Sequence, residues 1–76
     1  MIKAGIIGTG NIGTDLLLKL IKTEWITPII FAGRRMESPG IKIAQSKGVD
    51  VTDKGIQYFI DNPQCCDVVY DCTSAV

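Results

Sequence analysis

The segment Ala4-Gly5-Ile6-Ile7-Gly8-Thr9-Gly10-Asn11-Ile12-Gly13 contains the clearest structural signal in this chain. Its apolar first half predicts a short buried strand over residues 3–7, which Gly8 ends. Gly8, Gly10 and Gly13 then fit the G-x-G-x-x-G pattern at the opening of a helix. In this pattern the first glycine permits a tight turn, the second lets a pyrophosphate approach the backbone, and the third lets the helix pack close to the strand. Because free amides and the helix dipole bind phosphate, the segment predicts a dinucleotide site; a strand-to-helix turn without a ligand is the alternative.

Strands and helices are expected to alternate along the rest of the chain. Helical spacing of apolar residues, Ile12 among them, predicts a helix over residues 11–22 with Asp15 in its first turn. A strand follows over residues 27–32, and Pro28 is tolerated there only at the strand's start. The later elements are expected as a loop over 33–40, a helix over 41–47, a strand over 49–51, a helix capped by Thr52 that presents Ile56, Phe59 and Ile60 on one apolar face, and a strand over 67–71.

This β-α-β-α-β-α-β order implies a parallel sheet with right-handed crossovers, in the spatial order 3-2-1-4. The expected class is therefore α/β, specifically the first half of a Rossmann-type, doubly wound parallel sheet. Residues 1–76 are interpreted as one dinucleotide-binding domain from a longer enzyme.

Composition excludes several other classes of function. The chain has eight basic and eight acidic residues, and this balance gives no support to nucleic-acid or anionic-membrane binding. No apolar stretch is long enough for a signal peptide or a membrane span. The three cysteines, two of them adjacent, argue against a disulfide framework and favour a reducing cytoplasm. Without histidine or a Cys-x-x-Cys spacing, no metal site is predicted.

Two further segments are expected at the cofactor. After the second strand the dinucleotide fingerprint calls for an acidic residue that binds the ribose hydroxyls, but this chain has Arg34 and Arg35. Two guanidinium groups suit a 2′-phosphate, so these residues favour NADP slightly over NAD, unless they form only a solvated basic loop. After the fourth strand, Thr73 and Ser74 are expected to line the crevice beside the nicotinamide ribose. Cys72 is interpreted as a packing residue, because the chain offers no histidine to act as its base.

Two stretches resemble a known family. Residues 10–16, Gly-Asn-Ile-Gly-Thr-Asp-Leu, look like the start of acylating acetaldehyde dehydrogenases, and residues 67–75 are similar to that family's aspartate-x-threonine-serine-alanine segment. The resemblance implies oxidation of acetaldehyde with NAD and coenzyme A to acetyl-CoA, beside a 4-hydroxy-2-oxovalerate aldolase in the breakdown of aromatic compounds. It implies cofactor contacts at Thr9, Gly10, Asn11 and Ile12. The family's catalytic cysteine lies beyond residue 76, so no catalytic residue is assigned in this chain.

The chain departs from that family at two positions, and other functions stay open. The family generally has an acidic residue where Arg35 stands and alanine where Cys72 stands. One alternative is the cofactor half of another oxidoreductase, such as a semialdehyde dehydrogenase or a small-molecule reductase. The other is a nucleotide-sensing domain that catalyses nothing, because the fold alone does not decide function.

Overall fold

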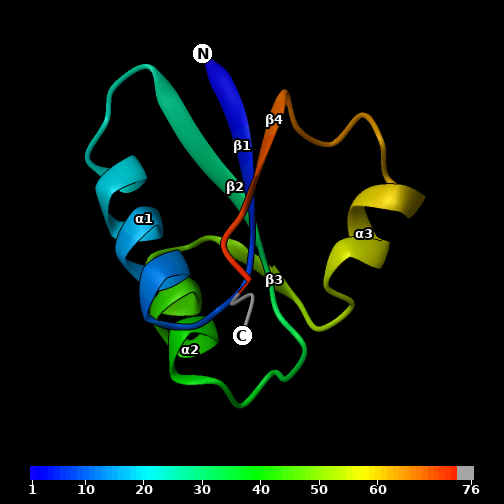
Figure 1. Ribbon diagram of the computed structural model, residues 1–76. Coiled ribbons are helices and arrows are strands. Elements are labelled where there is room, and N and C mark those ends of the chain that lie inside the picture. Colours follow the sequence, from blue (N-terminus) through cyan, green and yellow to red (C-terminus); the bar gives the residue numbers. More distant parts are fainter. Residues whose placement is uncertain (74–76) are drawn as a thin grey trace.

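The structure, a computed structural model, describes residues 1–73 as a four-stranded parallel sheet with helices on both faces (Figure 1). The strands are β1 (Ile2–Ile7), β2 (Ile26–Ala32), β3 (Asp50–Thr52) and β4 (Val68–Asp71), and the helices are α1 (Asn11–Ile21), α2 (Pro39–Ser46) and α3 (Ile56–Asp61). The strand order is β3-β2-β1-β4. The predicted class, element order and sheet order are therefore confirmed as the first half of a Rossmann-type sheet.

The core lies between the sheet and the helices α1 and α2, which share one face in Figure 1. Every second residue of β1 faces these helices, so Ala4 and Ile6 are fully buried. Leu17 of α1 and Ile41 of α2 meet the sheet from the other side and are also fully buried. This layer of apolar side chains fixes the amino termini of α1 and α2 near the carboxyl ends of the strands.

One expectation for α1 was wrong, and one residue of its apolar pattern lies outside the core. Ile12 has 74% of its surface exposed, because it lies at the open amino end of the helix. Asp15 lies beyond the first turn, in which no acidic residue is found. Its carboxylate instead forms an exposed ion pair with Lys19 one turn later, at 2.9 Å.

Pro28 lies inside β2 and not at its start. It is the third residue of the strand and pairs with Ala4, after which the register shifts so that Gly5 pairs with Ile30. Proline has no N–H for the ladder, and a bulge is one of the few places in a sheet that accept it. The irregularity beside Pro28 therefore explains how the strand continues past it.

The boundaries of α2 and β3 also differ from the expectation. Helix α2 begins at Pro39, two residues earlier than predicted, because proline's fixed φ suits the first helical position after Ser38. Strand β3 runs over Asp50–Thr52, where the sequence predicted residues 49–51. Thr52 extends the strand because its carbonyl accepts the backbone N–H of Gly33 at 2.9 Å.

Thr52 therefore does not cap α3. The capping residue is Gly55, whose φ of +56° favours glycine, and its N–H donates to the carbonyl oxygen of Gly33 at 3.0 Å. Helix α3 covers the opposite face of the sheet, where a Cβ at Gly5 would lie 2.5 Å from the Phe59 ring. Phe59 thus packs on the sheet as predicted, whereas Ile56 and Ile60 are mostly exposed.

Candidate functional site

Gly8 makes a turn that only glycine fits. Its φ is +105°, a conformation that other residues rarely adopt. A Cβ at Gly8 would also lie 2.7–2.9 Å from the backbone of Cys72 and Thr73 at the end of β4. The positive φ agrees with the tight turn predicted for the first glycine, and the turn between β1 and α1 also packs against the carboxyl end of β4.

Gly13 allows α1 to approach β1 closely. A Cβ at Gly13 would overlap the carbonyl oxygen of Gly8 and lie 3.5 Å from Cβ of Cys72. The helix cannot approach the strand this closely with any larger residue. This contact confirms the packing role predicted for the third glycine.

Gly10 differs from these two glycines because the protein itself does not require it. Its φ of −77° is ordinary, and a Cβ there would meet no atom within 4 Å. Gly10 caps α1, and no side chain of the described residues bonds to the cap. The first backbone amides of α1 therefore have no intrahelical acceptor and no side-chain partner, and the space beside Gly10 is open. Open space in front of free amides at a helix amino terminus is what an anionic ligand needs.

Helix α2 encloses the glycine turn from the side. A Cβ at Gly40 would lie 2.5 Å from the carbonyl oxygen of Thr9 and 2.6 Å from the hydroxyl of Thr14. A Cβ at Gly33 would lie 2.5 Å from the methyl group of Thr9. A pocket of about 340 Å³ opens between this turn, α1 and α2, lined by Thr9, Gly10, Asn11, Thr14, Asp15, Leu18, Pro39, Gly40 and Ile43. Sequence reasoning did not find the contacts of Gly33 and Gly40, because glycines outside the fingerprint carry no local signal of a close approach.

Arg34 and Arg35 lie where the second strand leaves the sheet. Both side chains are exposed, and neither forms an ion pair with the described residues. The preceding Gly33 packs against Thr9, so the arginine loop starts beside the glycine turn. Two uncompensated positive charges thus lie at the same edge of the sheet as the free amides of α1.

Thr73 is held by Asp71 on the other side of the glycine turn. Its backbone N–H and its hydroxyl both donate to one Asp71 carboxylate oxygen, at 3.0 and 2.6 Å. These hydrogen bonds hold the pKa of Asp71 below its ordinary value. The structure therefore brings Thr73 beside Gly8, and the predicted contact Ser74 lies outside the described residues. The sequence placed the backbone of Asp71 at this crevice but did not predict the bonds of its carboxylate to Thr73, although an aspartate two residues before a threonine is a recognised turn signal.

A family profile matches the chain over residues 3–64, which include the glycine turn, the arginine loop and α2. The profile is described as NADP oxidoreductase, coenzyme F420-dependent. The chain belongs to this oxidoreductase family. Its residues fit the dinucleotide, because the space at Gly10 is open and the first amides of α1 have no intrahelical acceptor.

Curated relatives of this oxidoreductase domain are aldehyde dehydrogenases. The chain is 54% identical to the acetaldehyde dehydrogenase of Pectobacterium atrosepticum, over 97% of the chain and 25% of the relative. It is 49% identical to acetaldehyde dehydrogenase 2 of Salinispora arenicola, with the same coverage. It is 40% identical to the propanal dehydrogenase (CoA-propanoylating) of Mycobacterium tuberculosis, over 96% of the chain and 24% of the relative. The chain thus spans about a quarter of the length of the curated relatives it matches.

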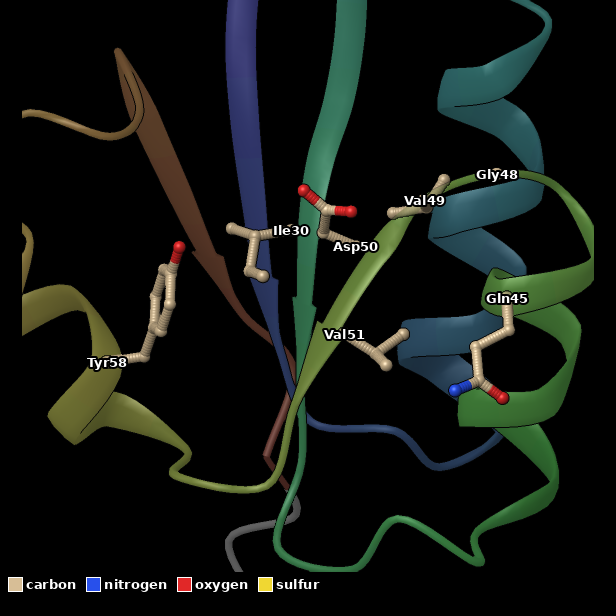
Figure 2. Close-up of a pocket in the computed structure, with 7 residues that line it drawn as sticks. All are labelled: Ile30, Gln45, Gly48, Val49, Asp50, Val51 and Tyr58. Atoms are coloured by element: carbon tan, nitrogen blue, oxygen red, sulfur yellow. The ribbon is translucent and has the colours of Figure 1, made fainter.

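A second and larger hollow in this oxidoreductase domain lies away from the glycine turn. It measures about 550 Å³ and surrounds the start of the edge strand β3, with Tyr58 on one side of the strand and Gln45 on the other (Figure 2). Its lining contains the Asp50 carboxylate and no lysine or arginine. The hollow also adjoins the carboxyl end of α2 at Gln45 and Gly48, where the helix dipole disfavours an anion. The glycine turn, at the amino end of α1, therefore remains the better site for a pyrophosphate despite its smaller pocket.

Cys72 lies at the glycine turn of this oxidoreductase domain but does not have the character of a nucleophile. Burial, with a smaller effect from the negative charge of Asp71, raises the pKa of its thiol. Its backbone N–H donates to the carbonyl oxygen of Ile7 at 2.7 Å, and its side chain packs against the core. The described residues also contain no group of three side chains suited to a metal ion and no helix long and apolar enough to cross a membrane.

Proposed function

We propose that this chain binds the nicotinamide cofactor of an acylating aldehyde dehydrogenase, which oxidises acetaldehyde and joins the acetyl group to CoA. The observation that carries the proposal is the open space at Gly10 in front of the free amides of α1. The names of the relatives, acetaldehyde dehydrogenases at 40–54% identity, supply the reaction. No relative named above supports the alternative of a domain that only senses the nucleotide.

In the proposed site, three segments of the chain would each contact a different part of the cofactor. The backbone amides of Asn11, Ile12 and Gly13 would donate to the pyrophosphate, with Gly8, Thr9 and Gly10 shaping the turn beneath it. Arg34 and Arg35 would lie at the adenosine end, and Thr73 and Ser74 at the nicotinamide end. The bound cofactor supplies the hydride acceptor; these residues of the chain bind it and orient it.

The charges in the arginine loop make NADP the favoured cofactor. A 2′-phosphate brings negative charge to a place where Arg34 and Arg35 have no acidic partner among the described residues. Arginine offers a planar fork of donors that matches phosphate oxygens. NAD remains the alternative because the resemblance to acetaldehyde dehydrogenases implies it.

The catalytic cysteine of the proposed enzyme lies outside this chain. The raised pKa of Cys72 opposes formation of the thiolate that attack on an aldehyde requires. The remainder of the enzyme would supply the nucleophile, the aldehyde pocket and the CoA site. The propanal dehydrogenase relatives make propanal the second candidate substrate, at 40% identity against 54% for the acetaldehyde dehydrogenase of Pectobacterium atrosepticum.

The resemblance to acetaldehyde dehydrogenases also suggests a partner enzyme, and the cysteines suggest a compartment. We propose that it works beside a 4-hydroxy-2-oxovalerate aldolase in the breakdown of aromatic compounds, because that aldolase releases an aldehyde. The three free thiols support a reducing, cytoplasmic compartment.

The test is an assay of the whole purified enzyme with acetaldehyde or propanal, NAD or NADP, and with or without CoA. We expect reduction of the cofactor to accompany formation of acetyl-CoA and to cease when CoA is omitted. Cofactor binding without reduction on either aldehyde would favour the sensing alternative. Sustained reduction without CoA would point to a non-acylating oxidoreductase.

A further inference from the structure

Two adjacent thiols lie together at the edge of the sheet opposite the glycine turn. Cys65 and Cys66 occupy the turn between α3 and β4, and their sulfur atoms are 3.4 Å apart. Both side chains are partly buried, and both are free thiols. The next residue, Asp67, bonds to the backbone of Lys3 at the start of β1. The pair is therefore anchored at the amino ends of β1 and β4, away from the proposed cofactor site.

The geometry of this thiol pair disfavours a disulfide. The Cα atoms of residues joined by a trans peptide are about 3.8 Å apart, whereas disulfides usually span about 4.4–6.8 Å. The backbone contains no cis peptide bond among the described residues. Closing the bond would also require the sulfur atoms to approach from 3.4 Å to about 2.05 Å. A single atom that bridges the two sulfur atoms at their present separation avoids that strain.

The bond angle at such a bridging atom can be calculated from this separation. With bonds of about 2.3 Å, the length of a zinc–thiolate bond, sulfur atoms 3.4 Å apart subtend about 95° at the bridge. This angle is narrower than a tetrahedral one. It suits a pyramidal, three-coordinate centre with a lone pair, such as arsenic(III).

The protonation state of Cys66 also favours arsenic(III) over a divalent metal ion. Burial, the hydrogen bond to Cys65 and the charges of Cys65 and Asp67 raise the pKa of Cys66 to about 12, and Lys3 opposes this only weakly. Divalent metal ions and oxidants react with thiolates, so a protonated Cys66 resists both. An arsenic(III)–oxygen compound instead takes up neutral thiols, because its oxygen leaves with their protons as water.

We propose that Cys65 and Cys66 form a capture site for trivalent arsenicals. In the capture step two arsenic–oxygen bonds break and two arsenic–sulfur bonds form. Both thiol protons leave with the oxygen as one molecule of water, and no atom is oxidised or reduced. Cys66 anchors the adduct to the sheet, because its sulfur lies 2.9 Å from where a Cβ at Gly5 would stand. Cys72, beyond the other end of β4, has no thiol neighbour to complete a chelate among the described residues.

The test uses phenylarsine oxide on the folded, purified protein in the presence of excess 2-mercaptoethanol, a monothiol. The protein is then unfolded in guanidinium chloride, so that burial no longer keeps Cys66 protonated, and the remaining thiols are blocked with iodoacetamide. The chain is cleaved by a protease that cuts before aspartate. Cleavage before Asp61 and Asp67 places Cys65 and Cys66 on one peptide, and cleavage before Asp71 places Cys72 on another. Mass spectrometry identifies which peptide carries the phenylarsenic group.

We expect one phenylarsenic group on the peptide of residues 61–66, with both of its cysteines protected, and a blocked Cys72. Dithiothreitol should remove the adduct. In excess 2-mercaptoethanol, the variants Cys65→Ser and Cys66→Ser should each fail to hold the phenylarsenic group. The matched control Cys72→Ser should retain it. If iodoacetamide blocked both Cys65 and Cys66 of the arsenical-treated wild-type protein, the proposal would be overturned by that result alone. Retention of the adduct by both single variants would also overturn it, because one thiol would then suffice.

Discussion

The backbone of Gly13 in α1 lies against the carbonyl oxygen of Gly8, so closely that a Cβ at Gly13 would overlap that oxygen. Gly13→Ala should therefore force α1 away from β1. We expect it to lower the free energy of unfolding by at least about 1–3 kcal/mol, the usual cost of overpacking, because backbone has less freedom to move than a side chain. Chemical denaturation of the protein measures this loss.

Gly10→Ala is the matched control for that variant. A Cβ at Gly10 meets no atom within 4 Å, and its φ is ordinary. We expect a cost of no more than about 1 kcal/mol, since alanine is a poorer helix-capping residue than glycine. If Gly13→Ala and Gly10→Ala lowered the free energy of unfolding equally, the close packing of α1 on β1 would not be what requires glycine at position 13.

The arginine loop should determine which cofactor is preferred. Charge-assisted hydrogen bonds contribute roughly 1.5–3 kcal/mol in favourable settings, which corresponds to about ten- to a hundred-fold in affinity, and exposure and salt reduce this. We expect the full enzyme to accept NADP at least as well as NAD. The double variant Arg34→Ala with Arg35→Ala should weaken NADP selectively, and more so at low salt.

The measurement is the ratio of kcat/KM for the two cofactors in the wild type and in the double variant. A ratio that strongly favours NAD in the wild type and stays unchanged in the variant would show that the arginines form only a solvated loop.

The Thr73–Asp71 contact should be visible in a pH titration. The two hydrogen bonds from Thr73 lower the pKa of Asp71 in the folded state. A lowered folded-state pKa contributes stability above the unfolded pKa of about 4, and this contribution is lost as the pH falls through the folded value. Thr73→Val removes the hydroxyl donor, so the pKa of Asp71 should rise toward its ordinary value. NMR titration of the carboxylate measures this, and an unchanged pKa would contradict the assigned contact.

The sequence predicted those features of the fold that depend on neighbouring residues. Apolar periodicity and the glycine spacing correctly placed β1, α1 and the sheet order, because a strand, a tight turn and a helix follow directly from residues 3–22. The roles of Gly8 and Gly13 could be stated in advance for the same reason. Packing within the protein does not require glycine at position 10. The sequence therefore predicted open space there only because a bound pyrophosphate would need it.

The features that the sequence missed depend on contacts between distant segments. Thr52 reads locally as a helix cap, yet its carbonyl continues the sheet by accepting the N–H of Gly33. Ile12 reads as part of an apolar helix face, yet it projects from the open end of α1. Gly40 approaches Thr9 only because the shared core holds α1 and α2 together.

If the space beside Gly10 holds the cofactor's pyrophosphate, the substitution Gly10→Val should abolish cofactor binding. A branched side chain would fill that space without touching the protein, so the fold should survive, as circular dichroism and thermal unfolding can verify. Titration of NAD and NADP into the full-length protein, followed by calorimetry, should give binding for the wild type and none for the variant. Cofactor affinity equal to that of the wild type in a folded Gly10→Val protein would contradict the account and remove the site from the glycine turn.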